Sequence, residues 1–178
     1  VNGDTGLFLP DFRSGEKVFQ LLYQAAGRSG RRRPGEVIIQ TYNPDNPVLK
    51  HAAKLDQKTY YNIALSERQE LNYPPFSWML RIEIQGIKKE HVVTHAEKIK
   101  RKLHPSPRGI EILGPANCYR ERLRGKYRMH IMLKSDKAHD SNGKKLHDYL
   151  QKRMSTKLFD SLPSSIKAFV DVNPMSVL

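Results

Sequence analysis

Apolar residues in the first forty positions change from a helical spacing to a short continuous run. Five of them recur at the i, i+3, i+4, i+7 and i+8 positions of an amphipathic helix within residues 16–26, namely Val18, Leu21, Leu22, Ala25 and Ala26. Gly27 marks the expected end of this helix. The run 37–39, Val-Ile-Ile, is typical of a strand that is covered on both faces of an α/β sheet. The pattern up to about residue 42 therefore predicts an α/β unit.

A turn and a longer helical stretch follow this unit. Residues 43–47, Asn-Pro-Asp-Asn-Pro, form a turn cluster, and the spacing over residues 48–72 predicts a helix. Pro74 and Pro75 end that helix, because proline lacks a backbone N–H donor and disfavours helical backbone in the preceding residue. The change of pattern predicts three parts, namely residues 1–50, a helical linker 51–75 and a C-terminal domain 76–178.

Strict alternation of apolar and polar residues begins after the two prolines. Leu80, Ile82 and Ile84 alternate with charged or polar residues, which is the pattern of a half-buried strand. Further stretches with helical or alternating spacing occur at 92–103, 110–112, 129–133, 146–158 and 166–172. Their order is β-α-β-β-α-β. The split βαβ arrangement, an antiparallel sheet with both helices on one face, buries the apolar side of every element, so we expect an α+β domain.

The chain is strongly basic. It carries 31 lysines and arginines against 18 acidic residues, a formal net charge of +13. This charge favours polyanionic partners through the release of their counterions, with nucleic acid first and an acidic protein tail second.

Cysteine and histidine usage narrows the class of protein further. Cys118 is the single cysteine, which excludes an intramolecular disulfide and a cysteine-rich zinc site within these residues. Basic residues beside Cys118 favour a lowered thiol pKa, although no catalytic partner is nearby. The seven histidines have no ligand spacing, so we expect no metal. No apolar run approaches the roughly 18 residues of a membrane span, and we expect a cytoplasmic protein without a membrane partner.

The loop after the first predicted helix contains a phosphate-binding pattern. Residues 24–31 are Gln-Ala-Ala-Gly-Arg-Ser-Gly-Arg, or Q-x-x-G-R-x-G-R, between a helix and a predicted buried strand. Gly27 permits tight backbone, while Arg28 and Arg31 carry planar guanidinium groups that suit phosphate oxygens. The alternative interpretation is a solvated basic loop.

A second basic cluster lies in the C-terminal half. Arg120, Arg122 and Arg124 alternate and so share one face of a strand, and Gly125 allows a turn. Lys126, Tyr127 and Arg128 continue the charge and add an aromatic ring. Such a hairpin is suited to following a nucleic-acid backbone and stacking bases, whereas the alternative is a charged hairpin that deters edge pairing.

Four blocks of sequence together carry a family resemblance. The pattern QAAGRSGR resembles motif VI of superfamily 2 helicases. The stretch LFLPDFRSGEKVFQLLYQAAGRSGRRRPGEVIIQTYNP resembles one branch, the PriA family of bacterial replication-restart helicases. In the same order, LSERQELNYPPFSWMLRI, ILGPANCYRERLRGKYRMHIMLKS and VDVNPMSVL are similar to blocks of that family's C-terminal domain. The resemblance covers essentially the whole chain.

The resemblance implies a role for each cluster. Residues 1–50 would be the end of a RecA-like second motor lobe, where Gln24, Gly27, Arg28 and Arg31 face ATP and the two arginines act as arginine fingers. The C-terminal domain would be ribosomal-protein-like and bind DNA forks through the hairpin residues Arg120, Arg122, Arg124, Lys126, Tyr127 and Arg128. Family partners would be the tail of single-stranded-DNA-binding protein and other primosome proteins.

The activity that the resemblance implies needs more than these residues. The intact protein would be an ATP- and Mg²⁺-dependent 3′-to-5′ DNA helicase with a zinc-binding insertion. This sequence contains no G-x-x-x-x-G-K-[ST] loop and begins without Met, so we expect a piece of a longer protein that binds DNA without hydrolysing ATP. A standalone basic RNA- or DNA-binding protein of ribosomal type remains the alternative, and a docking module for acidic tails is a third.

Overall fold

The protein divides into an N-terminal and a C-terminal unit. The computed structural model describes residues 1–28, 36–155, 158–160 and 162–177. Contacts group Val1–Glu70 into one unit and Leu71–Leu178 into the other. None of the described helices is long and apolar enough to span a bilayer. Each unit has its own buried core.

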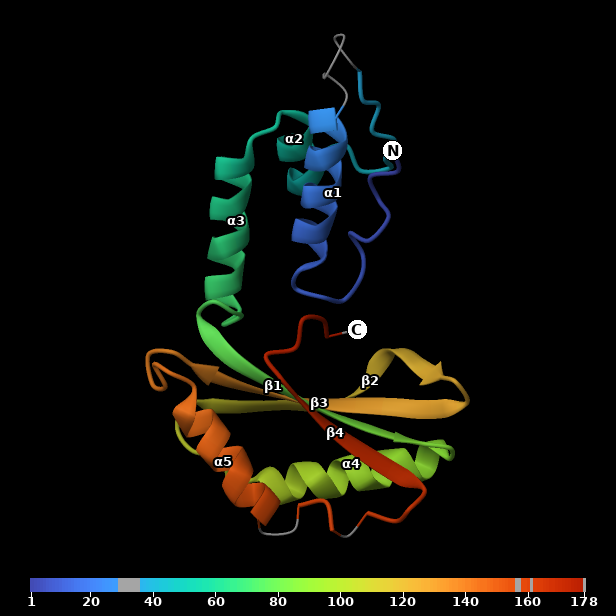
Figure 1. The fold of residues 1–178 in the computed structure, drawn as a ribbon, viewed down its shortest axis with the longest axis vertical. Helices are drawn as coiled ribbons and strands as arrows, with labels where there is room; N and C mark the ends of the chain where they lie inside the picture. The colour runs from blue at the N-terminus through green and yellow to red at the C-terminus, as the bar shows by residue number, and fades with distance from the viewer. Residues whose placement is uncertain (29–35, 156–157, 161, 178) are drawn as a thin grey trace. The chain divides into compact units, whose positions relative to one another are not determined.

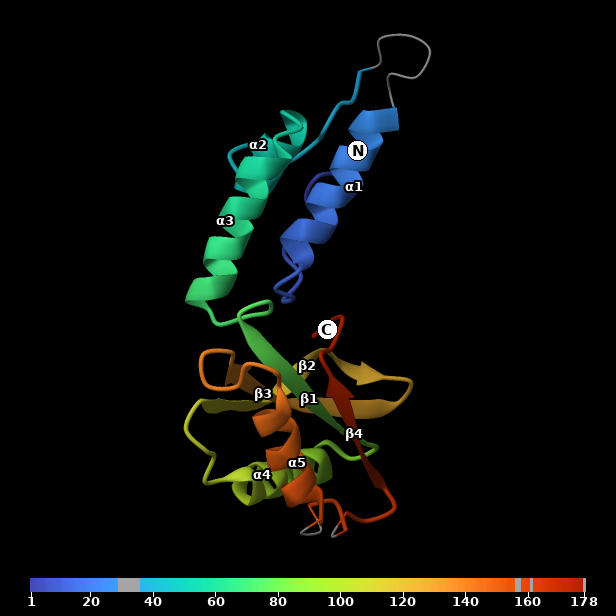
Figure 2. The ribbon, with the colours of Figure 1, turned by 60° about the vertical axis from the view of Figure 1, so that its left-hand side comes forward.

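The C-terminal unit is a four-stranded antiparallel sheet with two helices (Figure 1). Its elements, in chain order, are β1 Ser77–Gly86, α4 Lys89–Leu103, β2 Ile110–Leu123, β3 Lys126–Asp136, α5 Lys144–Ser155 and β4 Ile166–Val172. The strands lie in the order β2-β3-β1-β4. Figures 1 and 2 show α4 and α5 on the same side of the sheet. The predicted β-α-β-β-α-β order and split βαβ arrangement are therefore confirmed.

One face of the sheet forms the core with the two helices. Leu80, Ile82 and Ile84 of β1 lie opposite Leu133, Ile131 and Met129 of β3. Ile82 and Ile131 are completely buried, and they pack with the apolar faces of α4 and α5. The other face of the sheet carries the intervening residues, which include Arg81 and Glu83 of β1. Since the side-chain period of a strand is two, the alternation in the sequence decides which face is buried.

The chain enters this sheet through a segment that is fastened to β3. The Lys134 ammonium donates a hydrogen bond of 3.1 Å to the Leu71 carbonyl and lies 4.3 Å from the centre of the Tyr73 ring. Burial lowers the pKa of Lys134, whose side chain is nearly enclosed. Further along, the Trp78 indole N–H donates to the Asp140 carbonyl. The connection between the two units therefore ends at a well-defined entry into β1.

The N-terminal unit is built from three helices in its described part. They are α1 Ser14–Arg28, α2 Pro47–Ala53 and α3 Gln57–Glu70. Phe19 of α1 and Tyr60 of α3 stack with ring centres 4.1 Å apart, at the middle of a small apolar core. An ion pair between Glu16 and Arg68 joins the same two helices. The helix predicted over residues 16–26 is confirmed, although it continues beyond Gly27 to Arg28.

Two further predictions for this unit are wrong. Residues 37–39 do not form a doubly covered strand: Ile38 is 73 % exposed, and Gln40 makes a single parallel bridge with Asn2. An apolar run becomes a buried strand only where neighbouring strands and helices cover it. Among the described residues of this unit, the segment pairs through the single bridge with Asn2, and Ile39 packs against the helical core. The predicted helix 48–72 is two helices, because Leu55 adopts a positive φ of 54° between them. An α/β, RecA-like unit is thus not shown.

Candidate nucleic-acid interface

The basic hairpin is formed by the ends of β2 and β3, and we call residues 119–128 the basic arm. Leu123 pairs with Lys126 across a two-residue turn of Arg124 and Gly125. Both turn residues have positive φ, 50° and 79°, which suits the right-handed twist of the two strands. The turn predicted near Gly125 is confirmed.

The three alternating arginines of the arm do not follow a simple strand pattern. The register of β2 against β3 shifts between Asn117 and Arg122, so that extra residues of β2 oppose β3 there. Arg122 lies opposite Tyr127, with its guanidinium carbon 5.3 Å from the ring centre, whereas Arg124 lies in the turn. The prediction that alternation places all three on one strand face is therefore wrong. All three arginines are nevertheless exposed to solvent.

The two tyrosines of the arm have different surroundings. Tyr127 lies opposite Gly86 of β1, is partly buried and packs against the main core, with Arg122 over its ring. The ring is thus already occupied by packing and by the guanidinium group. Tyr119 is 53 % exposed and is the more accessible aromatic side chain. The sequence analysis chose Tyr127 as the aromatic residue of the binding site. That choice could not take account of its burial, which the neighbouring residues in the sequence do not reveal.

Arg128 is held by an ion pair inside the sheet. Its guanidinium donates two hydrogen bonds to the Glu83 carboxylate, at 2.8 and 2.9 Å. Both side chains are about seven-eighths buried. The hydrogen bonds from Arg128 hold the pKa of Glu83 below its usual value, and Arg81 adds to the effect. Arg128 is therefore committed to β1, unlike the exposed arginines of the arm.

Cys118 and His130 lie beside this ion pair. Burial raises the pKa of the Cys118 thiol, contrary to the lowering expected from its basic neighbours. Burial and the charge of Arg81 lower the pKa of His130. The desolvation penalty on each charged form exceeds the effect of nearby charges, so the cysteine has the properties of a core residue. No group of three potential metal ligands occurs among the described residues.

A contact that the sequence pattern missed joins the arm to the first turn of α4. The Lys89 ammonium lies 2.5 Å from a carboxylate oxygen of Glu121. Hydrogen bonding to Glu121 and the charge of its carboxylate raise the pKa of Lys89. The two residues are far apart in the chain, and only the β-α-β-β connection brings them together.

The motif VI residues are only partly within the described chain. Gln24 and Gly27 lie in the exposed last turns of α1, and Arg28 is its final residue. Arg31 lies outside the described residues, and so does the side chain of Arg28. The predicted grouping of these residues around a phosphate therefore stays a prediction.

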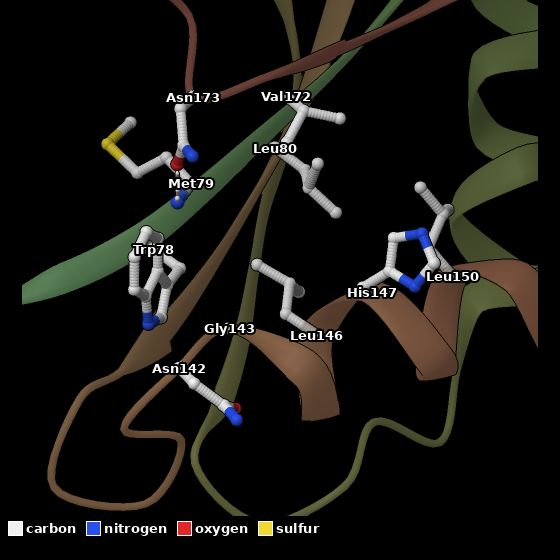
Figure 3. A pocket seen from close by; sticks show the side chains of 10 residues that line it. All are labelled: Trp78, Met79, Leu80, Asn142, Gly143, Leu146, His147, Leu150, Val172 and Asn173. Atoms are coloured by element: carbon white, nitrogen blue, oxygen red, sulfur yellow. Dashed lines mark hydrogen bonds between the residues drawn. The ribbon is translucent and has the colours of Figure 1, made fainter.

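A pocket of about 160 Å³ lies between β1 and α5 (Figure 3). Trp78, Leu80 and Leu146 point into it from the two elements. The remaining lining residues are Met79, Asn142, Gly143, His147, Leu150, Val172 and Asn173. None of these ten side chains is a lysine, arginine or carboxylate. The lining is mostly apolar, and His147 is the titratable side chain among these residues.

The fold and the arm define a class, namely a split βαβ domain that presents a basic β-hairpin. The model of the Primosomal protein N C-terminal domain family matches residues 69–175, and the chain belongs to this family. It is 33 % identical over 178 residues to the Replication restart protein PriA of Chlamydia pneumoniae, across 99 % of this chain and 23 % of that protein.

Other relatives carry the same name. The Replication restart protein PriA of Bacillus subtilis is 36 % identical over 136 residues, which is 75 % of this chain and 17 % of that protein. The protein of that name from Borreliella burgdorferi is 33 % identical over 184 residues, 100 % of this chain and 26 % of its own length. The chain thus spans about a quarter of these relatives or less, and it is a replication restart protein domain.

The Glu83–Arg128 pair yields a stability prediction. Glu83→Gln leaves the part-buried guanidinium without its carboxylate, so we expect the free energy of unfolding at pH 7 to fall by about 1–3 kcal/mol. The measurement is urea unfolding followed by fluorescence of Trp78, the single tryptophan. Glu97→Gln, at an exposed position of α4, is the control and should change stability by less than about 0.5 kcal/mol.

The same pair predicts a pH dependence. The folded pKa of Glu83 is lowered, so its stabilisation is complete above the unfolded pKa near 4.5 and is lost as the pH falls through the folded pKa. The gap between the native chain and Glu83→Gln should therefore shrink at pH 3. An equal gap at pH 7 and pH 3 would contradict this assignment.

Proposed function

We propose that this chain is the DNA-binding end of a PriA-type protein and that the basic arm contacts the phosphate backbone of forked DNA. The observation that carries the proposal is the exposure of Arg120, Arg122 and Arg124 at the end of the β2–β3 hairpin. Lys126 adds a fourth cation, against the single carboxylate of Glu121. A protruding basic hairpin can reach backbone phosphates that a flat sheet cannot.

The aromatic residue of the arm refines this proposal. Tyr119 is half-exposed beside Arg120, so it can stack on an unpaired base near a fork junction. The phosphate contacts supply affinity and the stacking supplies a preference for single-stranded ends or junctions. Arg128 does not take part, because Glu83 already binds its guanidinium.

The proposal extends to the intact protein. It is an ATP- and Mg²⁺-dependent 3′-to-5′ helicase of the bacterial cytoplasm that restarts stalled forks. It works with other primosome proteins and with the tail of single-stranded-DNA-binding protein, and its zinc site lies outside this chain. Arg28 and Arg31 of motif VI supply arginine fingers to ATP bound by another part of the protein. The names and lengths of the relatives support this role over a standalone ribosomal-type protein.

Removing positive charge from the arm tests its role in DNA binding. In the 178-residue chain, the triple variant Arg120→Gln, Arg122→Gln, Arg124→Gln should bind a labelled forked DNA more weakly. The slope of log affinity against log salt should flatten by about 2 to 3, because three phosphate contacts are lost. Fluorescence anisotropy across a salt series gives both quantities.

The matched control for the arm removes the same number of charges from α4. Lys98→Gln, Arg101→Gln, Lys102→Gln changes three exposed cations of that helix. We expect its salt slope to stay within about 1 of the native value. Equal flattening in both triple variants would show that net charge alone, rather than the arm, accounts for binding.

The motif VI proposal needs the full-length protein. Arg28→Ala should lower the ATP hydrolysis rate by about 10³-fold, because an arginine finger stabilises charge that develops on the transferred phosphoryl group. Fork affinity should change less than about threefold. Arg101→Ala on α4 serves as the control and should retain hydrolysis. A variant Arg28→Ala that loses DNA affinity but keeps hydrolysis would assign the loop to DNA instead.

A further inference from the structure

Glu121 is an acidic residue at the centre of an otherwise basic surface. It lies between Arg120 and Arg122, and Arg124 and Lys126 follow in the sequence; Glu83 binds Arg128, the fifth cation of the arm. Figures 1 and 2 show the β2–β3 turn and the first turn of α4 at the same end of the C-terminal unit. Through the 2.5 Å contact with Glu121, Lys89 at the start of α4 joins the arm.

Both members of this ion pair reach solvent. The side chains of Lys89 and Glu121 are 48 % and 39 % exposed. The Lys89 side chain is therefore accessible at the surface, while the Glu121 oxygen that contacts it is enclosed. Lys89 is the first residue of α4, so its contact with Glu121 adds the start of this helix to the surface of the arm.

The carboxylate acts on polyanion binding in two ways. It repels phosphate directly, and it offsets the charge of Lys89, which would otherwise add a fifth cation to the surface. Binding to a polyanion depends on the number of phosphates that are neutralised. A phosphate must also displace the carboxylate before it gains the ammonium group.

We propose that Lys89 is a further DNA-binding residue. Glu121 limits the affinity of the arm for DNA, because its carboxylate holds the Lys89 ammonium group. This inference rests on the proposed function of the arm. The Lys89–Glu121 ion pair keeps the affinity for DNA moderate and sensitive to salt, so that the domain can exchange between DNA sites. Glu121 is a positioning residue in this account, because it acts through Lys89 as well as through its own charge.

A double-mutant cycle on forked DNA tests the proposal. In the 178-residue chain, Glu121→Gln should tighten binding about 3- to 10-fold near 0.1 M salt and steepen the salt slope by about 1. Lys89→Gln alone should weaken binding less than about twofold. In the Glu121→Gln background, Lys89→Gln should cost at least about threefold, because Lys89 is then free to contact phosphate.

Controls separate this inference from general charge and from misfolding. Glu97→Gln raises the net charge by the same amount as Glu121→Gln, from an exposed site on α4, and should change affinity less than about 1.5-fold. Urea unfolding followed by Trp78 fluorescence should show equal midpoints for all variants. A gain in affinity for Glu97→Gln that matches Glu121→Gln would overturn the proposal.

The outcomes distinguish this inference from the function on which it rests. If the triple arginine variant weakens binding but Glu121→Gln changes nothing, the limiting role of Glu121 is wrong and the arm still binds DNA. If Lys89→Gln has the same effect in both backgrounds, Lys89 and Glu121 act independently and the proposal fails. If the triple variant also leaves binding unchanged, the arm is not the DNA site.

Discussion

The register between β1 and β3 is the constraint on which the C-terminal unit depends. Ile82 and Ile131 lie opposite each other and are fully buried beneath the helices, so a slip by one residue would turn polar side chains into the core. The same register sends Tyr127 toward the core and Arg128 to the other face. The basic arm is the end of the β2–β3 hairpin, where Tyr127 and Arg128 still pair with β1 and the three arginines Arg120, Arg122 and Arg124 are exposed.

Polar pairing on the other face of the sheet divides the arginines into two groups. Glu83 binds Arg128 across β1 and β3, and Asp171 of β4 lies 3.5 Å from Arg81 of β1. These cations link strands. Arg120, Arg122 and Arg124 lie at the exposed end instead. The net charge of the chain therefore overstates the number of cations that a polyanion can reach. Burial and ion pairing decide which cations remain accessible.

Sequence patterns predicted the C-terminal unit well because its strands obey local rules. The alternation of Leu80, Ile82 and Ile84 predicts a half-buried strand, and Arg124-Gly125 predicts a turn that closes the hairpin. Contacts between residues that lie far apart in the sequence could not be predicted from these local patterns. The shift of register before Arg122 and the meeting of Lys89 with Glu121 depend on how strands far apart in the chain align.

The N-terminal unit shows the limit of the same patterns. Phe19 and Tyr60 stack in the core of this unit although the predicted apolar face did not include Phe19, and Ile38 is exposed where a buried strand was expected. A β-branched apolar run indicates strand propensity, but its burial depends on neighbours, and among the described residues only Ile39 of this run packs against the helical core. The resemblance of residues 24–31 to motif VI rests on the residue pattern alone, and the ATP-binding role that it implies stays a prediction.

The central claim is that the end of the β2–β3 hairpin is where this domain meets DNA. Amide hydrogen exchange of the 178-residue chain, measured with and without saturating forked DNA, tests it most directly. The account predicts that DNA slows exchange most at residues 119–126, with a smaller effect at Lys89 and almost none at residues 98–102. Slowing at residues 98–102 without slowing at residues 119–126 would contradict it.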